Sequence, residues 1–167
     1  MEEQRIYAAS SDTPPLRILS TADIEVFEPI IERFQKLNPT VAIQYDVAST
    51  RELMRAIYEE GIAYDLVISS AMDLQTKLAN DGFAQGYSSE VTLAMPTWAR
   101  WRDRVFAFTQ EPAVLIISEE AFRSLPVPSN RRELIELLRD HGDSLEGKVG
   151  TYDIRSSGFG YLMATQD

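Results

Sequence analysis

The first half of the chain alternates between short apolar runs and longer segments in which apolar residues recur with helical spacing. Residues 16–19 form a β-rich run, and residues 41–45 form a second one. Between them lies an amphipathic segment, residues 24–37, whose apolar stripe consists of Phe27, Ile30, Ile31 and Phe34. A strand, a helix and a strand joined by short turns form a βαβ unit, whose crossover is right-handed and whose strands are parallel.

This order of a strand, a serine-bearing turn and a helix occurs three times. Ser49 and Glu52 form a capping box, which predicts the start of a second helix. Residues 65–69 are almost all apolar, as is typical of a buried parallel strand, and Ser70 is expected to cap a third helix. The sequence therefore predicts an α/β fold with a doubly wound sheet, in which the three strands are parallel and the first two are reversed in order.

The second half of the chain departs from this rhythm. Residues 83–103 are expected to be irregular chain with short helical pieces. The segments predicted to form strands in this half are 105–108, 113–117 and 147–152. The segments predicted to form helices begin at Ser118, at Ser129 or Asn130, and at Ser156.

Three parts of the chain are expected from these patterns. Residues 1–15 are polar and end in Asp-Thr-Pro-Pro, which predicts a flexible leader. Residues 16–107 are expected to form a first α/β lobe. Residues 108–167 are expected to form a crossover and a partial second lobe.

Composition narrows the classes of function. Twenty-six acidic against sixteen basic residues give a net charge of −10, which disfavours binding to nucleic-acid phosphates. No apolar run approaches the ~18 residues of a membrane span, and no nucleotide-binding loop or nucleophile elbow follows any strand. The lack of cysteine excludes disulfides and thiolate metal ligands, and His141 is expected to end a helix. We therefore expect a protein that is not an enzyme and needs no cofactor or metal.

Hydroxyl residues gather in the turns that precede the predicted helices. In a parallel sheet such turns meet at the carboxyl edge of the strands, where helix N–H groups have no intrahelical partner. Backbone N–H and hydroxyl groups can together hold a carboxylate, a phosphate or a sulfonate. The candidate ligand residues in these turns are Ser20, Thr21, Ser49, Thr50, Ser69, Ser70, Ser156 and Ser157. Because Ser and Thr also favour N-caps for structural reasons alone, each turn has a purely structural alternative.

Other candidate ligand residues lie beside or between these turns. Arg155, and less directly Arg51, either grip an anion through the guanidinium group or remain solvated helix-end charges. Thr109 and Glu111 lie where the chain is predicted to cross between lobes, and there they either touch ligand or only separate two strands. Tyr152 either stacks on a ligand or fills a core.

The order and spacing of these segments resemble the first half of a type II periplasmic solute-binding protein, of the subgroup that includes ferric-iron and small organic-anion receptors. The resemblance extends over residues 16–165. The segments that carry it are Leu16–Thr21, Val26–Phe34, Tyr64–Ser70, Leu78–Phe83, Ala113–Ile117, Gly147–Gly150 and Gly158–Tyr161. It implies a periplasmic-binding-protein-like doubly wound sheet with one complete lobe and part of a second, as in a fragment or a truncated sensor version.

The resemblance also implies a function. Such a receptor captures a small anionic solute in a cleft between two lobes and delivers it to the membrane permease of an ABC importer, outside the cytoplasm. One alternative is a periplasmic sensory input domain of a membrane signalling protein of the histidine-kinase type. Another is a ferric-iron receptor, with Asp23 or Asp73 as oxygen ligands. A truncated second lobe leaves open strand edges, so we expect a homodimer or a domain swap.

Overall fold

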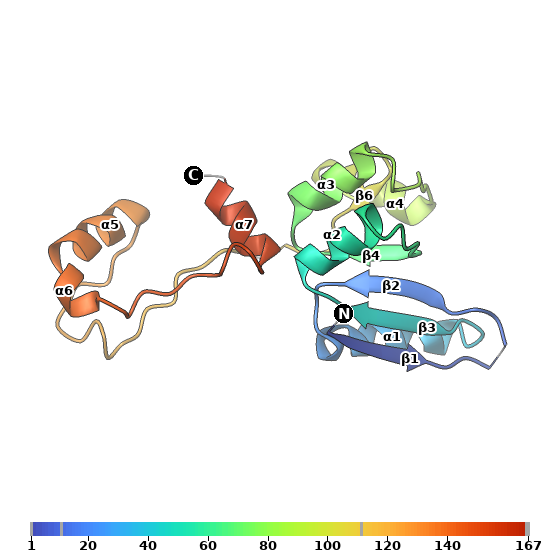
Figure 1. The fold of residues 1–167 in the computed structure, drawn as a ribbon, viewed down its shortest axis with the longest axis horizontal. Coiled ribbons are helices and arrows are strands. Elements are labelled where there is room, and N and C mark those ends of the chain that lie inside the picture. Colours follow the sequence, from blue (N-terminus) through green and yellow to red (C-terminus); the bar gives the residue numbers. More distant parts are fainter. Residues whose placement is uncertain (1, 11, 111, 166–167) are drawn as a thin grey trace. The chain divides into compact units, whose positions relative to one another are not determined.

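The computed structural model describes residues 2–10, 12–110 and 112–165, and its contacts divide the chain into two compact units (Figure 1). The first unit comprises residues 1–107 and 152–167, and the second comprises residues 108–151. Residues 152–167 therefore group with the first unit, whereas the predicted second lobe extended to the end of the chain.

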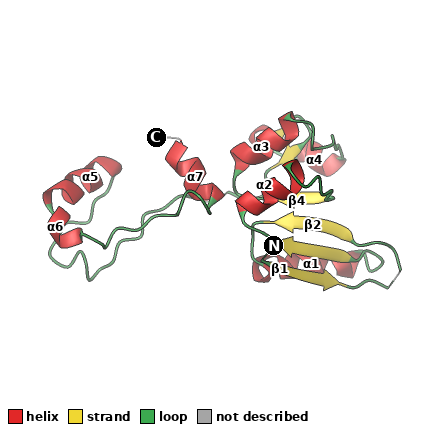
Figure 2. Ribbon diagram, in the orientation of Figure 1, coloured by secondary structure: helices red, strands yellow, loops and turns green. Residues whose placement is uncertain are grey.

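A four-stranded sheet is the centre of the first unit (Figure 2). Its strands are β1 (Glu3–Tyr7), β2 (Leu16–Ser20), β3 (Ile43–Val47) and β4 (Leu66–Ile68). The strand order is β1-β3-β2-β4, and β2 is parallel to both of its neighbours. The predicted parallel arrangement, with the first two of the predicted strands reversed in order, is therefore confirmed.

Strand β1 corrects the prediction of a flexible leader at residues 1–15. It pairs antiparallel with β3 along the edge of the sheet. Gln4 Nε2 donates to Asp46 Oδ1 at 2.7 Å, and Arg5 Nη1 lies 2.6 Å from Glu28 Oε1 on the first helix. An edge strand needs little apolar surface when its polar side chains find partners, so its composition did not distinguish it from a leader.

Helix α1 (Ile24–Leu37) covers one face of the sheet. Its buried residues Ile24, Phe27 and Ile31 pack in one cluster with residues of β2 and β3. The predicted stripe was wider than the buried surface, because Ile30 is 55% exposed and Phe34 is 39% exposed. The sheet therefore covers only part of the apolar face of α1.

Helices α2 (Thr50–Tyr58) and α3 (Met72–Asn80) pack against the opposite face. Ile18 of β2 belongs to the cluster under α1, whereas its neighbour Leu19 belongs to the cluster with α2 and α3. Successive strand residues point to opposite faces of a sheet, so helices cover both faces, as in a doubly wound α/β fold.

The remaining elements of the first unit are short. They are α4 (Glu90–Ala94), η1 (Thr97–Ala99), β5 (Arg100–Trp101), β6 (Val105–Phe106) and α7 (Gly158–Thr165). Strands β5 and β6 form an antiparallel hairpin, so the strand predicted at 105–108 ends two residues early. Its turn residues Arg102 and Asp103 both have a φ of +52°. No helix in the described part of the chain is long and apolar enough to span a membrane.

The second unit contains α5 (Arg131–Asp140) and α6 (Gly142–Leu145). Asn130 caps α5, since Glu133 N donates to Asn130 Oδ1 at 3.0 Å. The helix predicted to begin at Ser118 is only a series of turns, and none of the described residues of 113–117 or 147–152 forms a strand. A strand requires a hydrogen-bonding partner, and a purely apolar one also requires cover on both faces.

Candidate functional site at the carboxyl edge of the sheet

Strands β2, β3 and β4 end level with one another. Ser20, the last residue of β2, pairs with Val47 and Ile68, the last residues of its two neighbours. The turns that follow are linked by backbone hydrogen bonds from Thr21 N to Ile68 O and from Ala48 N to Ser20 O, both at 3.0 Å. We call the three turns, residues 20–22, 48–50 and 69–71, the mouth. It has the position at which parallel sheets bind ligands.

Two of the turns of the mouth are built in the same way. Ser20 Oγ accepts a hydrogen bond from Ala22 N at 3.0 Å, and Ser69 Oγ accepts one from Ala71 N at 3.2 Å. A serine that bonds the backbone two residues ahead fixes a turn locally. These two hydroxyl groups therefore fix the backbone of the turns that follow β2 and β4.

The third turn is held by a capping box. Glu52 N donates to Ser49 Oγ at 3.3 Å, while Ser49 N donates to Glu52 Oε2 at 3.2 Å. Ser49 is thus the N-cap of α2, as its spacing from Glu52 predicted. The prediction for α3 was wrong by one residue, because Ala71 and not Ser70 is its N-cap.

The second hydroxyl of each turn differs from the first. Among the described residues, no hydrogen bond is found for the side chains of Thr21, Thr50 and Ser70. Thr21 and Thr50 are half-buried, and Ser70 is exposed. Each turn thus uses one hydroxyl to fix its own geometry, and no hydrogen bond to another described residue is found for the second one.

Tyr45 lies buried beneath the mouth and was not among the residues singled out from the sequence. Its hydroxyl donates to Ala22 O at 3.0 Å. Burial raises the pKa of Tyr45, and a hydrogen bond with Ser20 acts in the opposite direction. Because Ser20 is also 0% exposed, we assign Ser20 and Tyr45 to the buried residues that support the mouth from beneath. The only sequence signal for Tyr45 was its place on a strand that ends at the candidate site.

Helix α7 brings the fourth hydroxyl turn to the mouth. Ser157 Oγ accepts a hydrogen bond from Gly160 N at 3.1 Å, and Ser156 Oγ donates to Asp153 O at 3.3 Å. Gly158 packs directly against Thr50 and Ala71. All four serine-bearing turns predicted from the sequence therefore lie within one unit, and two of the mouth's turns contact the start of α7.

Four other candidate residues, Tyr152, Arg155, Thr109 and Glu111, lie outside the turns that define the mouth. Tyr152 is 61% exposed and its ring lies edge-on to Phe159, with 5.7 Å between ring centroids. Arg155 is exposed. Thr109 is exposed and belongs to the second unit, and Glu111 lies outside the described residues. The structure thus gives Tyr152 a place next to α7.

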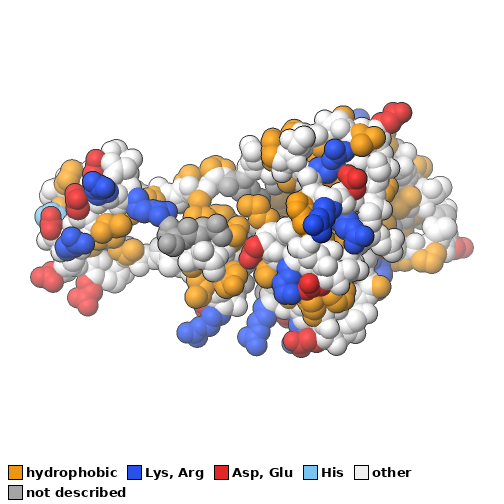
Figure 3. All heavy atoms as spheres, turned by 90° about the horizontal axis from the view of Figure 1, so that it is seen from above, with side chains coloured by type: hydrophobic (Ala, Val, Ile, Leu, Met, Phe, Trp, Pro, Cys, Tyr) orange, Lys and Arg blue, Asp and Glu red, His pale blue; other side chains and the backbone are white. Residues whose placement is uncertain are grey.

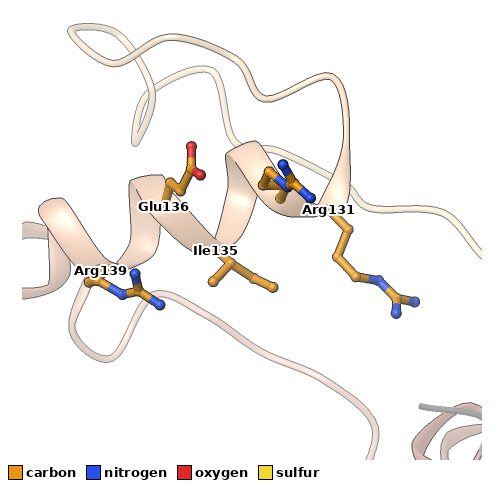
Figure 4. A pocket seen from close by; sticks show the side chains of 5 residues that line it. Arg131, Ile135, Glu136 and Arg139 are labelled. Carbon is orange, nitrogen blue, oxygen red and sulfur yellow. The ribbon is translucent and has the colours of Figure 1, made fainter.

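Two surface hollows lie on helices. One runs along α5 and is lined by Arg131, Arg132, Ile135, Glu136 and Arg139 (Figure 4). Since all of its residues come from a single helix, it is an exposed helix face and not an enclosed site. The other lies beside α2 and includes Arg51, Tyr58 and Lys77. Over the described residues, no group of three or more His, Asp or Glu side chains is placed to hold a metal ion.

Comparison with known proteins gives one family. Residues 16–165 match the family described as bacterial extracellular solute-binding protein. Among solved structures, the chain is similar to the substrate binding protein of the ABC transporter from Agrobacterium tumefaciens, with 35% sequence identity and a TM-score of 0.89. The match covers 99% of this chain and 51% of that chain, so this chain spans about half the length of that protein. No curated protein matches the chain.

Proposed function

This chain belongs to the bacterial extracellular solute-binding proteins, and on that basis we propose that its mouth is one wall of a cleft that captures a small anionic solute for an ABC importer. The proposed place of action is outside the cytoplasm, with a membrane permease as partner. Import is preferred to a sensory role, because the similar solved structure is described as part of an ABC transporter.

The arrangement of hydroxyl pairs supports the proposal most directly. In each pair, the proposed role of Ser20, Ser49 or Ser69 is to shape the turn, and the following hydroxyl residue binds solute. Under this proposal, the three hydroxyl groups that follow the level ends of neighbouring strands bind one small ligand together. Helix N-termini add a partial positive charge, so an anion can bind there even though the chain has a net charge of −10.

The surface as a whole does not favour anions, so a local site is required. Figure 3 shows acidic and basic side chains interspersed over the face that it presents. Fixed N–H and O–H dipoles act at hydrogen-bond distance, where screening by salt is weak, whereas distant surface charges are screened within about 8–10 Å. Selectivity for an anion is therefore assigned to the mouth and not to the net charge.

Calorimetric titration of the purified chain tests this proposal. The panel consists of acetate, succinate, methylphosphonate, sulfate and ferric citrate, with glycerol as a neutral control. We expect at least one anion to bind, and its affinity should not fall as ionic strength rises, because the contacts of the mouth are weakly screened and the screened long-range charge of −10 repels anions. Binding of ferric citrate alone would favour the iron-receptor alternative. Binding of none of the anions would contradict the proposal for this chain.

We also propose that the second unit associates with another copy of the chain through residues 113–117. Val114, Leu115 and Ile116 are 71%, 67% and 94% exposed, and they form an apolar run with high β propensity. Unpaired β-prone segments of this kind recruit other chains by strand pairing.

Sedimentation velocity at micromolar concentration measures this association. We expect species heavier than the 18.9 kDa monomer for the wild type and a shift towards monomer for Ile116→Lys. Val127→Lys is the matched control, because Val127 is 68% exposed in the same unit but outside the run. A wild-type chain that sediments as a monomer would refute the association.

A further inference from the structure

We propose that the exposed side of helix α1 is an interaction surface that binds the same surface of a second copy of the chain. We call it the α1 face, and it consists of Val26, Ile30, Phe34 and Leu37 of α1 together with Leu66 of β4. The α1 face shares no residue with the mouth or with the run at 113–117. The inference therefore depends neither on solute binding nor on association through that run.

A continuous apolar stripe runs along α1. The four α1 residues of the face are between 39% and 66% exposed. They follow one another by four, four and three positions, which puts them on one side of a helix with about 3.6 residues per turn. Single exposed apolar residues are normal on a protein surface, whereas a contiguous row of them marks a surface that binds another molecule.

The contacts of α1 show the direction in which the stripe points. Glu28 Oε1 accepts a hydrogen bond from Arg5 Nη1 of β1 at 2.6 Å. Gln35 Nε2, on the same side of the helix, donates to Tyr7 O of β1 at 3.1 Å. Ile30 follows Glu28 by two positions, about 200° around the helix, so the stripe lies on the side of α1 away from β1. In the strand order β1-β3-β2-β4, this is the side of the β4 edge.

Strand β4 extends the apolar surface beyond α1. Leu66 pairs with Ile18, whose side chain lies in the cluster under α1, so Leu66 points to the same face of the sheet. Leu66 is 49% exposed there, whereas Ile18 is 6% exposed. Among the described strands of this sheet, β4 pairs only with β2 and so forms its edge. A helix packed beside α1 would therefore also cover Leu66.

Charges along the stripe indicate that the partner is a second copy. Asp23 and Arg33 are exposed and continue the spacing, because Asp23 lies three positions before Val26 and Arg33 lies three positions after Ile30. Neither forms an ion pair with another described residue. When two α1 helices pack antiparallel, the acidic end of each lies beside the basic end of the other. The two apolar stripes then meet around a two-fold axis, as in an isologous dimer.

Sedimentation velocity of the Ile116→Lys chain tests the α1 face, because this variant removes the association through residues 113–117. We expect a concentration-dependent species of twice the 18.9 kDa mass of the chain. Adding Ile30→Lys should raise its dissociation constant at least about tenfold, since it puts a charge at the centre of the apolar contact. A monomer at every concentration, or a dimer that Ile30→Lys leaves unchanged, would overturn the proposal.

Val91→Lys provides the matched control. Val91 is 76% exposed on helix α4 of the same unit, outside the α1 face, so its substitution should leave the dissociation constant unchanged. A lysine lowers the self-repulsion of a chain with a net charge of −10, so net charge alone cannot explain a loss of association. An equal loss in the control would contradict the assignment to α1. Pairing also adds to apparent stability, so unfolding free energies of α1 variants are compared at concentrations where the chain is monomeric.

Exchange of the two charges tests the antiparallel arrangement. Asp23→Lys and Arg33→Asp should each weaken the pair about threefold or more, because each puts like charges side by side at two symmetric places. The double variant should regain the original dissociation constant to within about twofold, because opposite charges face each other again. Both substitutions are unfavourable to the helix dipole, so effects on the helix alone would add up in the double variant. A double variant weaker than either single one would overturn the pairing of α1 with a second copy.

Discussion

Replacing Ile31 with alanine is expected to lower the free energy of unfolding by about 2–5 kcal/mol. Ile31 is 4% exposed on the face of α1 that packs on the sheet, in the same cluster as Tyr45 and Ile43. Its truncation removes buried apolar surface and leaves a cavity, and the stability of a domain this size is itself only about 5–15 kcal/mol. Urea denaturation followed by circular dichroism measures the change.

The neighbouring residue provides the control for this prediction. Ile30 is 55% exposed on the same helix, so Ile30→Ala should change the unfolding free energy by no more than about 0.5 kcal/mol. Both substitutions alter helix propensity in the same way, so the difference between them measures burial alone. Equal effects of the two variants would mean that α1 does not pack as described.

This pair of residues also illustrates what the sequence could and could not predict. Helical spacing correctly identified α1 and the apolar side that faces the sheet. The same spacing could not show how much of that side is covered, because coverage depends on how distant segments of the chain pack against the helix. Ile30 and Phe34 were therefore assigned to the stripe although the sheet leaves much of each exposed.

Strands were predictable where an apolar run also found a strand to pair with, as β4 shows although its partner β2 is distant in the sequence. Strands β2 and β3, joined by α1, pair in register and were predicted with small errors at their ends. Strand β1 was missed because its stabilising contacts, such as Gln4 with Asp46, connect polar residues 42 positions apart. The run at 113–117 has the composition of a buried strand, but composition cannot supply the partner that a ladder requires.

The sequence predicted where the candidate site lies, but not which hydroxyl group in each turn bonds its own backbone. Four hydroxyl-bearing turns were expected at one edge of the sheet, and the level ends of β2, β3 and β4 put three of them there. Whether a given hydroxyl bonds its own turn depends on local backbone angles that the residue type does not fix. The same limit applies to Gly158, whose contact with Thr50 joins segments that are far apart in the sequence.

The hydroxyl pairs lead to the second prediction of a large effect, which concerns affinity. The binding set is Thr21→Val, Thr50→Val and Ser70→Ala, which removes the three hydroxyl groups that have no partner among the described residues. A hydrogen bond to a charged ligand contributes about 1.5–3 kcal/mol. Each substitution should therefore weaken binding of the tightest-binding anion of the panel by roughly tenfold or more. Valine keeps the shape of threonine, so the fold should change little.

A second group of variants, the supporting set, is expected to lose stability and keep most of its affinity. It consists of Ser49→Ala, Ser69→Ala and Ser157→Ala, whose hydroxyl groups each accept a backbone hydrogen bond at a turn or helix start. Each should lower the unfolding free energy by about 1 kcal/mol, the usual effect of a lost cap, and change affinity much less than the binding set. Titration calorimetry and urea denaturation of both sets measure the two quantities separately. If the supporting set lost affinity as strongly as the binding set, solute would contact both hydroxyl groups of each pair, and the assignment of one structural and one binding hydroxyl to each turn would be wrong.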